Sequence, residues 1–337
     1  MMTEVFRTPD GTPFVRTADH AFADLPEFDF APNYLETDGL RMHYVDAGPR
    51  SGPIALLMHG MPTWSFLNRH IINALTRKGW RCIAADHIGF GRSDKVTDET
   101  WYSLARHVEA HRRLIERLNL QDITLFCQDW GGPIGLAQPV LAPERFSRLV
   151  IMNTWLHHAD YPYSDALRLW RSRWEENGLF ASNIPERLSI GWFMMIPFGY
   201  MKPADLFAII QTGAHPSLPP GHEAVRRGYD APFFGLDRSG HAGVRRFPLS
   251  LPFANPEGGG ADLQARCWRD LLSWKKPVHF IWGGTDDIFT EGWGRSWASR
   301  FPQATFDILP DAFHFLQETH GTQIADFFLK RAAEPVS

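Results

Sequence analysis

Short runs of apolar and β-branched residues alternate with amphipathic stretches along most of this chain. Residues 54–60 (IALLMHG) and 122–127 (DITLFC) predict buried strands, whereas residues 102–120 have the apolar spacing of a helix. Strands that alternate with helices indicate a parallel sheet that is covered by helices on both faces. The alternation therefore predicts a fold of the α/β class.

The alternation stops between residues 155 and 235, where the sequence is helix-like and rich in Trp, Phe, Met and Pro. It resumes with a predicted strand at residues 277–284. This interruption predicts a core domain made of residues 1–154 and 236–337, with a helical cap domain at residues 155–235. The apolar cap residues expected to build a substrate cavity are Phe193, Met194, Met195, Ile196, Phe198 and Phe207.

Charge and cysteine usage argue against several classes of partner. The formal net charge is −4 and no long basic run is present, so a nucleic-acid or anionic-membrane surface is not expected. Cys82, Cys127 and Cys267 lack the spacing of a zinc site and predict buried free thiols. We see no signal peptide and no run of about 18 apolar residues, which makes a cytoplasmic location the expectation.

The stretch LFCQDWGGPIGLA (residues 125–137) places Asp129 between a predicted strand and a predicted helix. Cys127 and Gly131 flank it as small residues two positions away on either side. This pattern matches the sharp turn that carries the serine of GxSxG hydrolases, with an aspartate in place of the serine. The amides at the start of the following helix can hold negative charge there. Asp129 is therefore a candidate nucleophile.

Two further residues follow predicted strands in the chain order nucleophile, acid, base that this architecture uses. Asp286 comes after one strand and His314 after the next. Asp287 is an alternative acid, but we prefer Asp286 because it is third after Gly283, where the strand ends. The sequence thus predicts a triad of Asp129, Asp286 and His314.

Several stretches resemble the haloalkane dehalogenases of the α/β-hydrolase fold, namely HGMPTWSF (59–66), DHIGFGRSDK (86–95), CQDWGG (127–132), GVRRFP (243–248) and DAFHF (311–315). The resemblance covers most of the chain and is weakest in the cap. It implies a mostly parallel eight-stranded sheet flanked by helices, with the cap inserted after the strand at about 146–153. It also implies hydrolysis of small haloalkanes to alcohol, halide and a proton. The partners would be substrate, halide and water, without cofactor or metal, in a monomer or homodimer.

The resemblance also assigns roles to single residues. Asp129 would be the nucleophile, His314 the base and Asp286 the acid that supports it. The motif is most similar to the subfamily that binds halide with two tryptophans, which here would be Trp130 and Trp170. Trp174 lies four residues further along the same helical face and stays an alternative to Trp170.

The oxyanion hole would consist of the backbone N–H groups of Met61 and Trp130. Met61 departs from the resembled family, in which this position is usually Glu in this subfamily or a halide-binding Asn in another. Its backbone N–H can still donate, but no polar side-chain contact is available. A halide site based on Asn is therefore excluded, and the cap tryptophan gains importance.

Two other functions are compatible with parts of the pattern. An epoxide hydrolase shares the Asp nucleophile and His base but needs cap tyrosines to protonate the epoxide oxygen. The tyrosines in or near the cap are Tyr161, Tyr163, Tyr200 and Tyr229. A non-catalytic ligand-binding protein is the second alternative, although an intact triad argues against it. Trp130 directly after the nucleophile and the PTW turn at residues 62–64 favour halide release over epoxide opening.

Overall fold

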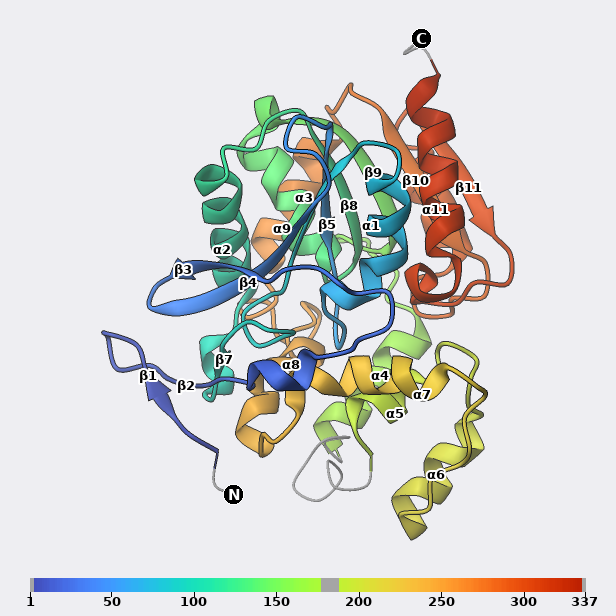
Figure 1. Ribbon diagram of the computed structural model, residues 1–337. Coiled ribbons are helices and arrows are strands. Elements are labelled where there is room, and N and C mark those ends of the chain that lie inside the picture. Colours follow the sequence, from blue (N-terminus) through green and yellow to red (C-terminus); the bar gives the residue numbers. More distant parts are fainter. Residues whose placement is uncertain (1–2, 177–187, 335–337) are drawn as a thin grey trace.

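The computed structural model describes residues 3–176 and 188–334 (Figure 1). Its centre is an eight-stranded sheet in the order β11-β10-β9-β8-β5-β6-β4-β3. The strands from β6 to β11 in this order pair in parallel, whereas β4 is antiparallel to both β6 and β3. The strand bounds are β3 (Asn33–Thr37), β4 (Leu40–Ala47), β5 (Ile54–Met58), β6 (Arg81–Ala85), β8 (Ile123–Asp129), β9 (Phe146–Thr154), β10 (Val278–Gly283) and β11 (Ala304–Leu309). The predicted mostly parallel sheet is thus confirmed.

Helices flank this sheet because each buries one apolar stripe against it. On α2, for example, Leu104, Val108 and Leu114 are buried, and the Ser103 hydroxyl caps the helix by accepting from the Arg106 N–H at 3.4 Å. Figure 1 shows α1 beside α11, with α2, α3 and α9 grouped apart from them. The flanking helices are α1 (Arg69–Thr76), α2 (Leu104–Arg117), α3 (Gly131–Leu141), α9 (Ala261–Leu271), α10 (Glu291–Ala298) and α11 (Leu316–Ala333).

The segment between β9 and α8 (Ala242–Leu249) forms helices and no strand within its described residues. Its helices are α4 (Asp165–Glu176), α5 (Ile190–Met194), α6 (Pro203–Thr212) and α7 (His222–Asp230). Figure 1 shows them together at one end of the molecule, below the sheet. A helical insertion therefore follows β9, while the exact domain boundaries at residues 155 and 235 stay predictions.

Smaller elements complete the described chain. A second sheet joins β1 (Phe6–Arg7), β2 (Pro13–Val15) and β7 (Lys95–Val96). The short 3₁₀ helices are η1 (Asp19–Phe22), η2 (Ser65–Asn68), η3 (Glu99–Trp101), η4 (Pro143–Arg145), η5 (Ala231–Phe233) and η6 (Arg238–His241). None of the helices in residues 3–176 and 188–334 has the length and apolar character needed to cross a bilayer.

A buried ion pair ties the helical insertion to the core. Arg69 on α1 donates to both carboxylate oxygens of Glu318 on α11, at 2.6 and 2.5 Å. Tyr229 on α7 donates to the same carboxylate at 2.5 Å. Beside this contact, the Trp64 indole N–H donates to the Gly228 carbonyl at 3.0 Å. Two elements of the core and one of the insertion therefore meet at a single carboxylate.

The ionisation of Glu318 links this contact to pH. Burial alone would raise the pKa of Glu318, but the Arg69 guanidinium, together with hydrogen bonds from His70 and Tyr229, more than offsets burial and lowers the pKa from 4.5 to about 2. A folded-state pKa below the unfolded value means that the pair stabilises the fold fully above about pH 4.5. That contribution is lost as the pH falls from about 4.5 toward 2.

Replacing Glu318 by Gln leaves the Arg69 charge buried without a counter-ion, so we expect the free energy of unfolding at pH 7 to fall by about 3 kcal/mol. Chemical denaturation followed by circular dichroism measures this loss. The control is Glu116→Gln, which removes an exposed ion pair with Arg112 and should cost less than about 1 kcal/mol. Equal losses in the two variants would contradict a special role for the buried pair.

Candidate active site

Asp129 is the last residue of β8, and α3 begins two residues later at Gly131. Its φ of +50° lies in the left-handed region, which a residue other than glycine adopts only when its surroundings enforce it. A Cβ atom at Gly60 would lie 2.2 Å from Asp129 Oδ1, and one at Gly132 would lie 1.8 Å from Thr154 Oγ1. The Thr154 hydroxyl donates to the Asp129 carbonyl at 2.5 Å. The strand–turn–helix predicted from the sequence is thus held by close packing.

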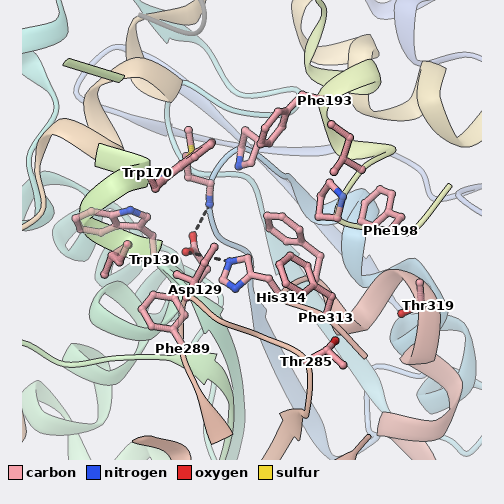
Figure 2. Close-up of a pocket in the computed structure, with 18 of the residues that line it drawn as sticks. Asp129, Trp130, Trp170, Phe193, Phe198, Thr285, Phe289, Phe313, His314 and Thr319 are labelled. Atoms are coloured by element: carbon pink, nitrogen blue, oxygen red, sulfur yellow. Dashed lines mark hydrogen bonds and ion pairs between the residues drawn. The ribbon is translucent and has the colours of Figure 1, made fainter. Parts of the chain in front are cut away.

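The two oxygens of the Asp129 carboxylate have different neighbours. Oδ1 accepts a hydrogen bond from the Met61 N–H at 2.7 Å, whereas Oδ2 lies 3.4 Å from His314 Nε2 (Figure 2). The Met61 amide therefore contacts the carboxylate, while its part in an oxyanion hole stays a prediction. Within the described chain, no hydrogen bond joins the Trp130 amide to this carboxylate, and its share in an oxyanion hole stays a prediction.

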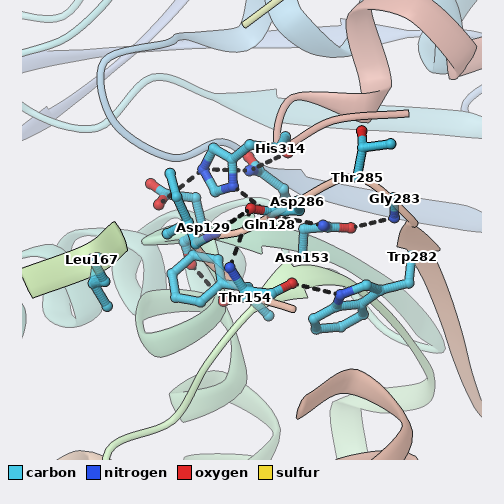
Figure 3. A network of polar contacts seen from close by, with 12 residues as sticks. Gln128, Asp129, Asn153, Thr154, Leu167, Trp282, Gly283, Thr285, Asp286 and His314 are labelled. Carbon is cyan, nitrogen blue, oxygen red and sulfur yellow. Dashed lines mark hydrogen bonds and ion pairs between the residues drawn. The ribbon is translucent and has the colours of Figure 1, made fainter. Parts of the chain in front are cut away.

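His314 and Asp286 lie in the loops after β11 and β10. The His314 Nδ1–H donates to Asp286 Oδ2 at 2.9 Å (Figure 3). The other oxygen, Asp286 Oδ1, accepts from the N–H groups of Ile288 and Phe289 at 2.8 and 3.2 Å. The alternative acid, Asp287, is exposed. The structure thus brings together Asp129, His314 and Asp286. Of the two candidate acids, Asp286 is the one that the sequence analysis preferred.

A residue that the sequence analysis missed holds Asp286 in place. Asn153 is fully buried near the end of β9, and its Nδ2 donates to Asp286 Oδ2 at 2.7 Å. Its Oδ1 accepts from the Gly283 N–H at 2.7 Å, so the amide bridges β9 and the end of β10 (Figure 3). A lone Asn at the end of a predicted strand carries no local signal of this contact.

The charge state of His314 depends on both carboxylates. Burial would lower the pKa of His314, but Asp286 and Asp129 more than offset burial and raise the pKa from 6.5 to about 10. The ring is therefore an imidazolium at neutral pH while both carboxylates are ionised. Loss of the Asp129 charge would remove one of the two carboxylates that raise the pKa of His314, and that pKa would fall.

Asp129 and His314 line a cavity of about 790 Å³ (Figure 2). Of the cap residues expected there, Phe193, Ile196 and Phe198 line it. Met194 and Met195 do not, because they are completely buried in the hydrophobic core. The Phe207 side chain lies outside the described residues. Apolar lining residues that the sequence did not reveal come from the loops of the core, from α4 and from α8, and they include Trp155, Leu167, Pro248, Phe289, Phe313 and Phe315.

Trp130 and Trp170 both line this cavity, and Figure 2 shows them on the same side of Asp129. No hydrogen bond within the described part of the chain uses either indole N–H, so both remain available to a ligand. Trp174, the alternative to Trp170, is not among the lining residues and is only 3% exposed. It packs edge-on against Trp170 with ring centroids 5.4 Å apart. The geometry therefore favours Trp170 as the cap donor.

The cap tyrosines do not reach the candidate nucleophile. None of Tyr161, Tyr163, Tyr200 and Tyr229 lines the cavity. The Tyr229 hydroxyl is engaged by Glu318, and the Tyr163 hydroxyl lies 2.8 Å from His157 Nδ1. The arrangement gives no support to the epoxide hydrolase alternative, which needs tyrosine hydroxyls at the reacting oxygen.

Other reactive side chains are not gathered around Asp129. Across the two described ranges, no group of three or more His, Cys, Asp or Glu residues is arranged to hold a metal ion. The three cysteines are free and buried, as predicted. Cys127 lies two residues before Asp129, but burial raises the pKa of its thiol and keeps it protonated. The Cys127 thiol is therefore not a competing nucleophile beside Asp129.

Comparison with known proteins agrees with this geometry. The family profile described as the alpha/beta hydrolase fold matches residues 53–321. A haloalkane dehalogenase of Psychrobacter cryohalolentis is 35% identical over 94% of this chain and 97% of its own. Haloalkane dehalogenase 1 of Mycobacterium tuberculosis is 37% identical over the same shares, 94% and 97%. The tetrameric structure of a haloalkane dehalogenase from Paraglaciecola agarilytica is 28% identical, with a TM-score of 0.79 over 96% of this chain and 99% of that one.

Replacing Asp286 by Asn removes the carboxylate that contributes most to the imidazolium, so the pKa of His314 should fall by about 1 to 3 units. Nitrogen chemical shifts of the His314 ring, measured by NMR as a function of pH, report this change. Asp287→Asn is the matched control, because its exposed side chain should leave the His314 titration unchanged. A larger shift in the control than in Asp286→Asn would contradict the arrangement.

Proposed function

Because this chain belongs to the haloalkane dehalogenases, a family of the α/β-hydrolase fold, we propose that it hydrolyses haloalkanes to an alcohol, a halide ion and a proton. One observation carries the assignment of roles. A carboxylate oxygen, Asp129 Oδ2, faces an apolar cavity in which two indole N–H groups have no partner in the described chain. A carboxylate suits displacement at a saturated carbon, because it needs no base to become a nucleophile and its attack forms an ester.

The first step is an in-line displacement by Asp129. Its Oδ2 forms a bond to the carbon that carries the halogen, and the carbon–halogen bond breaks with its electron pair leaving on the halide. Oδ1 keeps its hydrogen bond from the Met61 N–H, and this bond fixes the orientation of the attacking oxygen. The products of this step are an alkyl ester of Asp129 and a halide ion.

Trp130 and Trp170 are proposed to hold the leaving halide. Charge develops on the halogen as the bond breaks, so N–H donors aimed at that position stabilise the transition state more than the substrate. Indole carries no positive charge of its own, which allows the halide to leave the site afterwards. Met61 cannot supply a polar side chain at the cavity wall, and halide binding therefore depends on the two indoles.

The second step hydrolyses the ester with the help of His314. Alkylation removes the negative charge of Asp129, the pKa of His314 falls, and the ring releases its proton to solvent. Neutral His314 then takes a proton from a water molecule as that water attacks the ester carbon of Asp129. The tetrahedral oxyanion is proposed to be held by the Met61 and Trp130 amides. Its collapse breaks the bond to the alcohol, which takes the proton back from His314. The carboxylic acid of Asp129 then gives its proton to His314, which restores the carboxylate and the imidazolium.

The cavity leaves room for more than the small haloalkanes expected from the sequence. A volume of about 790 Å³ lies within the range that accommodates a drug-sized ligand. Lys202, Asp311, Thr319 and His320 also line it and supply its polar groups. We propose that longer haloalkanes are accepted beside short ones. Substrate, halide and water are the proposed partners, and a monomer or homodimer in the cytoplasm stays our prediction.

Replacing His314 by Phe should leave ester formation intact and stop ester hydrolysis. Incubation with 1-bromobutane should then release about one bromide per enzyme and add the mass of a butyl group at Asp129, as measured by ion chromatography and peptide mass spectrometry. Asp129→Asn serves as the control and should give neither bromide nor adduct. Styrene oxide tested on the unmodified enzyme separates the epoxide alternative. Sustained bromide turnover by Asp129→Asn would overturn the assignment of the nucleophile.

Replacing Trp170 by Phe removes one of the two proposed halide donors while keeping an aromatic ring. We expect kcat/KM for 1-bromobutane to fall by about 100-fold and bromide binding, followed by tryptophan fluorescence, to weaken. Trp174→Phe is the matched control on the same helix and should change kcat/KM by less than about threefold, because its ring does not line the cavity. A larger loss in Trp174→Phe than in Trp170→Phe would reverse the assignment of the cap donor.

A further inference from the structure

Gln128, the residue directly before the candidate nucleophile, contacts His314 twice. Its side chain is completely buried, and its Nε2 donates to the His314 carbonyl at 3.0 Å. The same Nε2 lies 3.2 Å from His314 Nε2, the ring nitrogen that faces Asp129 (Figure 3). The mechanism described above does not use Gln128, although it touches the atom that must accept a proton from water.

The contacts of Gln128 determine which of its two amide atoms faces the ring. A carbonyl oxygen can only accept a hydrogen bond, so the atom that faces the His314 carbonyl must be the NH₂ group. The opposite end agrees, because Gln128 Oε1 accepts from the Gln317 amide at 3.5 Å. One hydrogen of the Gln128 NH₂ group is therefore committed to the His314 carbonyl, and the other is available to the ring.

This hydrogen distinguishes the two charge states of His314. In the imidazolium, Nε2 carries a hydrogen of its own, and two donors then face each other across 3.2 Å. In the neutral ring, whose Nδ1–H is fixed by Asp286, Nε2 presents a lone pair that can accept from Gln128. A donor that bonds only to the neutral form favours that form.

We propose that Gln128 is a positioning residue for ester hydrolysis. Its amide favours the neutral form of His314 by donating to the Nε2 lone pair, until the attacking water molecule displaces this hydrogen bond and gives its proton to Nε2. The inference rests on the proposed function, in which Asp129 becomes an ester and His314 acts as the base. Gln128 transfers no proton itself and touches neither substrate nor ester in this proposal. It acts through the ring nitrogen and through the backbone carbonyl of His314.

The charged groups that face His314 explain when Gln128 matters. They are Asp129 at the end of β8 and Asp286 in the loop after β10. Before alkylation both carboxylates stabilise the imidazolium, and together they stabilise it more than the Gln128 amide stabilises the neutral ring. After alkylation only Asp286 remains, and the Gln128 amide then shifts the balance toward the neutral ring. The effect should therefore appear in the second chemical step and not in the first.

The test replaces Gln128 by Met, which keeps the length of the side chain and removes both amide atoms. Rapid-quench measurements with 1-bromobutane separate the bromide burst, which reports alkylation, from the steady-state rate, which reports ester hydrolysis when that step is slow. Both are measured between pH 5.5 and 10. Gln138→Met is the matched control, since Gln138 is a buried glutamine on α3 whose amide bonds the Val108 and Ile134 carbonyls away from His314.

We expect the burst of Gln128→Met to stay within about threefold of the unmodified enzyme, because alkylation does not need a base. The pH midpoint of ester hydrolysis, at which its rate is half of the maximum, should move up by about one pH unit in Gln128→Met. Below that midpoint, ester hydrolysis should be about tenfold slower than in the unmodified enzyme. Gln128→Glu should move the midpoint higher still, because a carboxylate favours the imidazolium. Gln138→Met should leave the midpoint unmoved.

Two results would overturn the proposal. One is that the pH midpoint of ester hydrolysis does not move in either Gln128 variant. The other is that the bromide burst and ester hydrolysis slow by the same factor. If general loss of packing caused that slowing, Gln138→Met would show it too. Failure of the proposed function itself looks different. In that case the unmodified enzyme releases no bromide from 1-bromobutane, in a burst or in the steady state.

Discussion

The placement of one imidazole between two carboxylates depends on the order of the strands. Asp129, Asp286 and His314 lie at or after the ends of β8, β10 and β11. Parallel pairing in the order β11-β10-β9-β8 brings these ends to the same edge of the sheet. Burial of three ionisable groups would be costly without their mutual contacts. The sheet order and the strained turn at Asp129 therefore serve the same end, which is to keep these charges within contact distance.

The same arrangement links charge to the sequence of chemical events. Two carboxylates make the ring a cation at rest, which is unsuited to proton abstraction. In the proposed mechanism, ester formation removes one carboxylate charge and so converts the ring into a base when a base is first needed. Asn153 and Gln128 act on opposite sides of this ring, one through Asp286 and the other at Nε2. Both are neutral amides, so they orient the charged groups without adding a charge.

The sequence predicted the parts of the site that have local signatures. Asp129 stands in a strand–turn–helix motif, and Asp286 could be preferred over Asp287 from its distance to the end of a strand. Trp170 and Trp174 could not be separated, because residues four apart share a helical face and only the tertiary structure shows which ring reaches the cavity. The apolar character of Met194 and Met195 predicts a place in the cavity, but both side chains are buried in the core and neither lines the cavity. The residues that Asn153 and Gln128 contact belong to distant segments of the chain, so no periodic pattern in the sequence predicts these contacts.

The contact between Tyr229 and Glu318 joins α7 of the insertion to the segment that carries His314. Glu318 belongs to the first turn of α11, and that helix begins two residues after His314. The segment that carries the base is thus fastened to α7 of the insertion through a single carboxylate, and to α1 through Arg69. Because α7 packs against α5, whose Phe193 lines the cavity, the wall of the cavity and the His314 imidazole are connected through α7 and Glu318. A displacement of α7 would therefore act on the short segment between His314 and Glu318.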